Sequence, residues 1–179
     1  MKALNLYFSS TGNTEKVALT ISDTLKELGL AIDTLRIKST EMDIDLLQYD
    51  MVFAGSGVYA WLPGKPLMDL FASLRKAAMS GGAIQPASPK IPGKKAVIYC
   101  TYGGVHTGVN EAVPAVKYMG QLFDHLGFTI VGEWYVLGAY RPEKMKAHSV
   151  NGRMGDIRER PDSADLKDVA ERVKGILRV

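Results

Sequence analysis

Cysteine is scarce in this chain, which has only Cys100 among its 179 residues. One thiol excludes an internal disulfide framework, and it also excludes a cysteine-clustered zinc or iron–sulfur site within the chain. The three histidines are scattered through the sequence and do not have the spacing of a metal site. Cys100 ends an apolar run, so we expect it to be buried and to have a packing role.

Long apolar runs are also missing. None approaches the roughly 20 residues that cross a bilayer, so we expect no membrane span. The chain passes from Met1 almost directly into a short apolar run, which predicts no secretory signal and a cytoplasmic protein.

The chain has a small net charge, because its basic and acidic residues nearly balance. The formal net charge is +3, and the basic residues are spread out apart from Lys94-Lys95 and the stretch 144–160. No nucleic-acid recognition motif accompanies this charge, so a nucleic-acid partner is not expected. We also find no Ser/His/Asp set and no paired carboxylates in a shared loop, so no residue is assigned a catalytic role.

What the sequence does contain is a regular alternation of strands and helices. Short apolar runs predict five strands, and apolar residues at helical spacing predict amphipathic helices between and after them. This order is typical of a doubly wound parallel sheet in a single domain spanning residues 1–179. The strands are expected at 4–8, 31–37, 50–55, 96–100 and within 128–137, and the helices at 15–28, 66–78, 112–126 and 164–177, with Asp162 or Ser163 as the last cap.

Two further stretches have less regular patterns. Residues 38–49 are polar and predict an irregular segment or a short helix, with Leu46 and Leu47 docked on the core. Residues 80–93 are rich in Gly, Pro and Ser and predict a surface loop.

The loop after the first strand is built mostly of hydroxyls and amides, and it leads into a helix. Backbone N–H groups at a helix N-terminus favour an anion, and the side chains add further donors. The loop has no lysine, so it is not a nucleoside-triphosphate loop, and it lacks the G-x-G-x-x-G of dinucleotide folds. A terminal phosphate monoester fits these donors; the alternative is a capping loop without a ligand. The loop residues are Ser9, Ser10, Thr11, Gly12, Asn13 and Thr14.

This loop, and its place directly after the first strand, resembles the phosphate-binding loop of the flavodoxin family, which holds the 5′-phosphate of FMN. The resemblance implies FMN as the cofactor. It also implies an α/β three-layer sandwich with a five-stranded parallel sheet in the order 2-1-3-4-5. In such sheets ligands bind beyond the carboxyl ends of the strands, so the loops after strands one, three and four should meet.

The loop after the third strand, residues 55–64, contains two glycines, two aromatic residues and Pro-Gly, which favour an irregular backbone bent around a flat ligand. The resemblance implies that this loop contacts the flavin. Tyr59 or Trp61 would stack on the ring; alternatively, they only cover the end of the sheet. Ser56, Gly57 or Val58 would offer a backbone group near N5 of the ring.

The loop after the fourth strand would lie along the other edge of the flavin. Its candidate residues are Thr101, Tyr102, Gly103 and Gly104. Tyr102 is the candidate for a second stacking ring, and the two glycines allow close approach of the backbone. His106, in the same loop, is either a proton donor near the flavin or a solvated loop histidine, and we expect the latter.

Residues 138–162 form an unusually long connection before the last helix, and long connections are often functional. We expect an extended loop that forms a lid, a partner surface or a subunit contact. Short flavodoxins lack so long a segment at this point.

The resemblance implies a flavodoxin-like redox protein that uses FMN to transfer electrons between partner proteins. The alternative is an NAD(P)H-dependent FMN oxidoreductase that reduces a quinone or another small acceptor, with a protoporphyrinogen oxidase as a variant. The basic net charge favours this alternative, because flavodoxins are typically acidic and dock on basic partners. A third hypothesis is an interaction module of the same fold that has lost FMN.

Overall fold

The computed structural model describes residues 1–38, 42 and 44–178, and all five predicted strands and all four predicted helices are present. The strands are β1 (Lys2–Phe8), β2 (Ala31–Arg36), β3 (Met51–Tyr59), β4 (Leu62–Pro63), β5 (Lys95–Tyr102) and β6 (Thr129–Leu137). The helices are α1 (Asn13–Glu27), α2 (Lys65–Ser80), α3 (Val113–His125), α4 (His148–Asn151) and α5 (Ser163–Ile176). Within the residues described, the short 3₁₀ helices are η1 (Leu46–Gln48), η2 (Gly108–Glu111) and η3 (Glu143–Met145).

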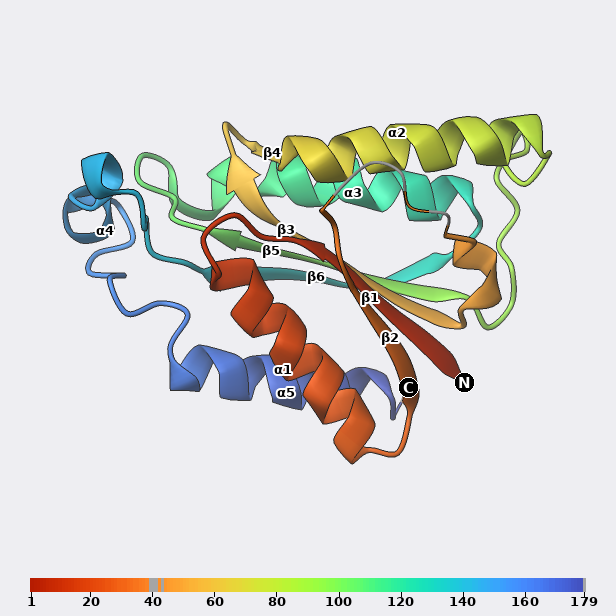
Figure 1. The fold of residues 1–179 in the computed structure, drawn as a ribbon, viewed down its shortest axis with the longest axis horizontal. Helices are drawn as coiled ribbons and strands as arrows, with labels where there is room; N and C mark the ends of the chain where they lie inside the picture. Colours follow the sequence, from red (N-terminus) through yellow and green to blue (C-terminus); the bar gives the residue numbers. More distant parts are fainter. Residues whose placement is uncertain (39–41, 43, 179) are drawn as a thin grey trace.

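Five parallel strands form the sheet in the order β2-β1-β3-β5-β6 (Figure 1). The predicted fourth and fifth strands are therefore β5 and β6, and the predicted order 2-1-3-4-5 is confirmed. The two-residue strand β4 is additional, and it pairs antiparallel with the end of β3.

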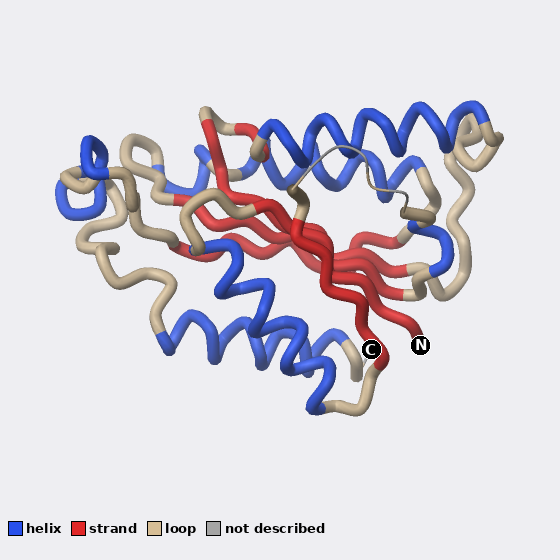
Figure 2. Tube along the Cα trace, in the orientation of Figure 1, coloured by secondary structure: helices blue, strands red, loops and turns tan. Residues whose placement is uncertain are grey.

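Helices cover both faces of the sheet, with α1 and α5 on one face and α2 and α3 on the other (Figure 2). Strands buried on both faces have continuous apolar runs instead of an alternating pattern. This explains why β3 and β5 were recognisable from their sequences alone.

The last helix, α5, begins at a predicted cap. Asp162, one of the two predicted caps, accepts hydrogen bonds from the backbone N–H groups of Ala164 and Asp165 at the start of α5.

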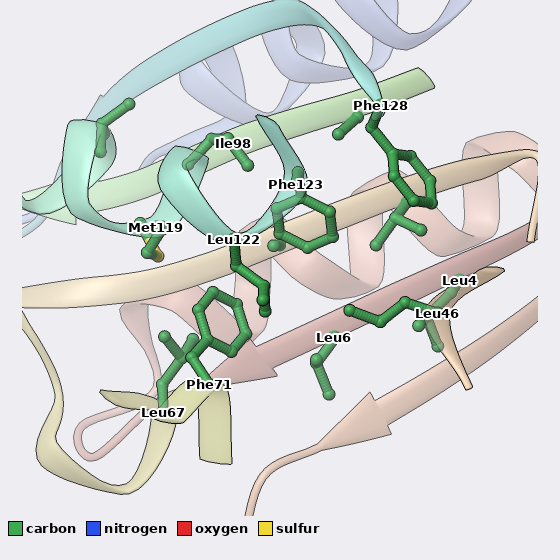
Figure 3. Close-up of a cluster of buried hydrophobic side chains, with 14 of the residues drawn as sticks. Leu4, Leu6, Leu46, Leu67, Phe71, Ile98, Met119, Leu122, Phe123 and Phe128 are labelled. Atoms are coloured by element: carbon green, nitrogen blue, oxygen red, sulfur yellow. The ribbon is translucent and has the colours of Figure 1, made fainter. Parts of the chain in front are cut away.

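The larger hydrophobic cluster lies between the sheet and the helices α2 and α3 (Figure 3). The ring of Phe123 packs edge-on against Phe71 of α2 and against Phe128, with ring centroids 5.8 and 5.7 Å apart. Cys100 lies in this cluster with no exposed surface, and burial raises the pKa of its thiol. The predicted packing role of Cys100 is thus confirmed.

A small polar network on the opposite face fixes the position of α1 on the sheet. The Asn5 side chain donates from Nδ2 to the Ala18 carbonyl (2.7 Å) and to Ser22 Oγ (3.0 Å). The Tyr99 hydroxyl donates to Asn5 Oδ1 (2.9 Å). The Tyr99 ring lies over Gly55, where an added Cβ would come within 2.0 Å of the ring. The network anchors α1 so that its N-terminus lies at the carboxyl edge of the sheet.

The expectation for residues 38–49 can be compared only in part. The structure shows η1 there with Leu46 buried, whereas 39–41 and 43 lie outside the described residues. None of the helices described is long and apolar enough to cross a membrane.

Candidate functional site

A cavity of about 460 Å³ opens at the carboxyl edge of the parallel strands. This volume lies within the range typical of small-ligand sites, roughly 300–1,000 Å³. Four parts of the chain form its walls: the loop before α1, the β3–β4 hairpin, the end of β5 with the loop that follows, and the segment 138–148. The three predicted loops therefore meet, and a fourth segment joins them.

The first wall is the loop from Ser9 into α1. Ser10, Thr11, Asn13 and Thr14 line the cavity. Gly12 is the N-cap of α1 at a φ of +93°, a conformation that favours glycine, and no side chain caps the helix. The N-terminal N–H groups of α1 are therefore available for an anion.

Ser9 and Gly12 support this wall without lining the cavity. The Gly12 N–H donates to Ser9 Oγ (3.1 Å), and the Ser9 side chain is buried. Arg36 holds the loop from outside, because its Nη2 donates to the Ser9 carbonyl (3.0 Å). These contacts fix the turn from which the neighbouring hydroxyls project.

Thr14 connects the first wall to the end of β5. Its hydroxyl and that of Thr101 lie 2.7 Å apart and share a buried hydrogen bond. Both residues line the cavity. The predicted first and third loops are thus joined directly by two of the predicted residues.

The second wall corrects the expectation of an irregular loop at 55–64. Strand β3 continues to Tyr59, and the chain turns back at once into β4. The two turn residues, Ala60 and Trp61, have φ values of +46° and +68°. Two-residue hairpins require such values to match the strand twist, and they usually contain glycine or asparagine. The sequence lacked that signal, so the hairpin was missed.

The hairpin presents apolar side chains at the rim of the cavity. Tyr59, Trp61 and Leu62 are 40%, 62% and 41% exposed. The Tyr59 hydroxyl lies 2.6 Å from Ser10 Oγ, which joins the hairpin to the first wall by a hydrogen bond. Gly57 and Val58 also line the cavity.

Ser56 differs from the other residues predicted in this loop because its side chain is engaged within the hairpin. Its hydroxyl donates to the Gly57 carbonyl (2.8 Å) and accepts the Gly64 N–H (2.9 Å). The residue has no exposed surface and does not line the cavity. Ser56 holds the base of the hairpin.

The third wall is the end of β5 with the loop that follows. Here the structure places the Tyr102 side chain differently from the expectation. Tyr102 is the last residue of β5, and its side chain is 7% exposed and packed in the larger hydrophobic cluster. It lies two residues after Cys100 and therefore on the same face of the strand. Tyr102 nevertheless lines the cavity, together with Thr101, Gly103 and Gly104. The Tyr102 ring is a core residue at the edge of the cavity and has little surface for stacking.

Tyr140, which sequence reasoning missed, places an aromatic ring on this wall. A Cβ added at Gly103 would lie 2.1 Å from the Tyr140 ring, so glycine is required for this contact. Burial raises the pKa of Tyr140, and a hydrogen bond with the Val105 backbone lowers it in part. His148 packs edge-on against the same ring, with centroids 5.4 Å apart.

The fourth wall is the segment 138–148, which includes Tyr140, Arg141, Pro142, Met145 and His148. It is held in place at Ala139, whose carbonyl accepts a hydrogen bond from Asn13 Nδ2 (2.8 Å). Downstream, the Arg153 N–H donates to the Val105 carbonyl (2.9 Å). No periodic pattern marks this segment in the sequence; only its position after a strand next to β5 could have placed it here.

Charged groups line the cavity at different walls. Glu111 Oε1 accepts the backbone N–H groups of His106 (2.6 Å) and Thr107 (2.7 Å), so its carboxylate closes the loop after β5. His106 is exposed and lines the cavity, so its role stays a prediction. Arg141 lies against the first wall. Within the residues described, no cluster of three or more His, Cys, Asp or Glu is arranged to hold a metal.

Comparisons with known proteins agree with this architecture. The family model described as Flavodoxin matches residues 6–172. A curated protein from Bacillus subtilis (strain 168), named probable flavodoxin 1, is 38% identical over 84 residues. That alignment covers 45% of this chain and about half, 51%, of the Bacillus protein.

Solved structures show the same fold at low identity. Oxidised flavodoxin 1 from Bacillus cereus superposes with a TM-score of 0.67 at 16% identity, covering 99% of this chain and 98% of the other. A flavodoxin from Streptococcus pneumoniae TIGR4 gives a TM-score of 0.63 at 21% identity, with 98% and 99% covered. Because the family model spans nearly the whole sheet and all four walls of the cavity, we conclude that the chain belongs to the flavodoxin family.

Proposed function

We propose that this protein binds FMN in the cavity and carries electrons between partner proteins. Proteins of the flavodoxin family bind FMN. The observation that carries the proposal is the meeting of an uncapped helix N-terminus, hydroxyl donors and exposed aromatic side chains around one cavity. A phosphate fits the helix N-terminus and the hydroxyl donors, and a flat aromatic ring fits the exposed aromatic side chains.

The residues present fit the cofactor in chemistry as well as in size. Ser10, Thr11 and Thr14 provide neutral donors beside the N-terminus of α1, which suits a phosphate that is held and not transferred. The residues at the other walls include glycines and the aromatic residues Tyr59, Trp61 and Tyr140. When bound, FMN supplies the redox chemistry, and the protein binds, orients and shields it.

Exposed side chains at the rim support transfer to another protein. The exposed residues Tyr59, Trp61 and Leu62 cluster on a hairpin next to the cavity. Aromatic surface of this kind is enriched at protein interfaces. We propose that this hairpin lies between the cofactor and the partner, so that an electron leaves by a short path.

The first test is a titration of the purified, flavin-free protein with FMN, followed by flavin fluorescence and visible absorption. We expect saturable binding of one FMN per chain. A protein that is colourless as purified and changes neither signal would contradict the proposal, and would favour an interaction module that has lost the cofactor.

A second candidate function is an FMN-dependent reductase that takes hydride from NAD(P)H and passes electrons to a quinone or another small acceptor. The observation that favours it is the fourth wall, where Tyr140, Met145 and His148 enlarge the cavity beyond the three predicted loops. Anaerobic mixing of the FMN-loaded protein with NADH or NADPH separates the two. Rapid loss of the oxidised flavin absorbance supports the reductase, whereas its persistence supports the carrier.

A further inference from the structure

Arg141 lies beside the loop predicted to hold a phosphate, although it is 128 residues away from that loop in the sequence. Its Nε donates to Asn13 Oδ1 (3.2 Å), and Asn13 belongs to the loop itself. Both residues line the cavity together with Thr11 and Thr14. A guanidinium group from the fourth wall is therefore placed at the first wall.

Further hydrogen bonds hold this guanidinium in one orientation. Nη1 of Arg141 donates to the Arg158 carbonyl (3.2 Å), and Nη2 donates to the Arg160 carbonyl (3.3 Å). The neighbouring backbone is fixed as well, because the Ala139 carbonyl accepts a bond from Asn13 Nδ2. A side chain held in advance loses little conformational freedom when a ligand binds.

The charge of Arg141 is not neutralised by a neighbouring acid. Among the described residues no carboxylate pairs with it, whereas Arg158 pairs with Asp156 and Arg160 pairs with Asp165. A guanidinium has five N–H donors, and three are used in the bonds given above. The remaining donors and the charge are available to an anion in the cavity.

We propose that Arg141 is a phosphate-binding residue, and that it makes the site select a flavin with a terminal phosphate over riboflavin. This inference rests on the proposed function. A phosphate monoester carries a charge of about −1.5 to −2 near neutral pH, and arginine binds such groups through paired N–H donors. The loop itself supplies neutral donors only. Arg141 is thus the cation that this loop lacks.

The experiment measures dissociation constants for FMN and for riboflavin on the same protein. Arg141→Gln should weaken FMN binding about tenfold to a hundredfold, the range for a lost bond to a charged group. Riboflavin binding should change less than about threefold, because no phosphate is present. Arg158→Gln is the matched control: it removes the same charge from the same segment but its side chain does not line the cavity. We expect Arg158→Gln to preserve the preference for FMN.

Equal loss of both flavins in Arg141→Gln, or no loss of either, would overturn the proposal. Wild-type protein that binds neither flavin would instead remove the proposed function. Arg141→Lys provides a second variant, which keeps the charge without the paired donors. It should bind FMN with an affinity between those of the wild type and Arg141→Gln, while riboflavin binding is unchanged.

Inorganic phosphate gives a readout that needs no flavin. We expect phosphate to raise the melting temperature of the flavin-free wild type and of Arg158→Gln, but not that of Arg141→Gln. The melting curve without phosphate shows at the same time whether each variant is folded. Equal stabilisation of the wild type and Arg141→Gln would contradict a role for Arg141 in binding phosphate.

Discussion

Thr11 and Thr14 stand three residues apart in the first wall, yet their hydroxyls have different surroundings. Thr11 is exposed at the cavity, whereas Thr14 is 2% exposed and bonded to Thr101. A hydroxyl that is exposed at the cavity contributes to the binding of a ligand. A buried, bonded hydroxyl also contributes to the stability of the fold. Thr11 therefore reports on ligand binding alone, whereas Thr14 reports on both ligand binding and the stability of the fold.

Thr11→Val should weaken FMN binding about tenfold, because a phosphate oxygen loses one donor. The free energy of unfolding, measured in urea, should stay within about 0.5 kcal/mol of the wild type. Thr20→Val, in α1 but away from the cavity lining, is the control, and its FMN affinity should not change. Unchanged FMN affinity in Thr11→Val would argue against a phosphate at this wall.

Thr14→Val should affect both properties. The substitution leaves the Thr101 hydroxyl without its buried partner, which costs roughly 1–3 kcal/mol of the free energy of unfolding. FMN binding should also weaken. Urea unfolding of the single variants and of the Thr14→Val/Thr101→Val double variant tests the pair. A double variant with the summed loss of the two single variants would show that the hydroxyls do not interact.

Tyr49, which does not line the cavity, should make the stability of the fold depend on pH. Burial, followed by the hydrogen bond to Asp33, raises the pKa of Tyr49 from about 10 to about 12. Its stabilising contribution is therefore complete below pH 10 and is lost as the pH rises towards 12. Tyr49→Phe, which cannot ionise, should show a smaller fall in stability across this interval. Alkaline unfolding followed by circular dichroism measures it, with the exposed Tyr118→Phe as control; identical slopes would contradict the assignment.

The β3–β4 hairpin shows how an element can hold strain next to a site. Ala60 and Trp61 both have positive φ, which is uncommon for residues other than glycine. Such conformations persist where the surrounding structure enforces them, and they cluster at ligand sites. Here the enforcing contacts include the bond between Tyr59 and Ser10 and the turn held by Ser56. These contacts anchor both ends of the hairpin.

Ala60→Gly should stabilise the protein by about 0.5–1 kcal/mol, because glycine adopts positive φ without a steric cost. Ala60 is exposed, so the substitution removes little packing. Urea unfolding measures the change, and Ala72→Gly in the helix α2 is a control that should destabilise instead. Loss of stability in both variants would show that Ala60 is not strained.

The elements of the sheet could be predicted because buried strands and amphipathic helices leave clear periodic patterns. The burial of Tyr102 also had a signal, since it follows Cys100 by two residues on one strand face. The β3–β4 hairpin had no signal in the sequence, because its turn lacks glycine and asparagine. The fourth wall had none either: Tyr140 and Arg141 reach the cavity through the position of β6 beside β5, which only the fold supplies.

At the scale of the whole molecule, binding in the cavity should stabilise the fold, because the walls are brought together only in the folded chain and the unfolded chain has no such site. A ligand at 100 times its dissociation constant adds about 2.7 kcal/mol. For a chain of this size, FMN should therefore raise the melting temperature by roughly 5–10 °C. Scanning calorimetry with and without FMN tests this, with AMP as a phosphate ester that lacks the flavin. No shift with FMN, or the same shift with AMP, would contradict binding of the flavin in the cavity.

The distance in sequence between Asn13 and Arg141 has a consequence for how the protein is made. Asn13 of the first wall is synthesised first, and Arg141, which contacts it, follows 128 positions later. At about 5–20 residues per second, the gap corresponds to roughly 6–25 seconds of translation. During that interval a nascent chain has the loop before α1 but neither Arg141 nor the fourth wall. If FMN binds as proposed, we therefore expect it to be bound only after the fourth wall has been synthesised.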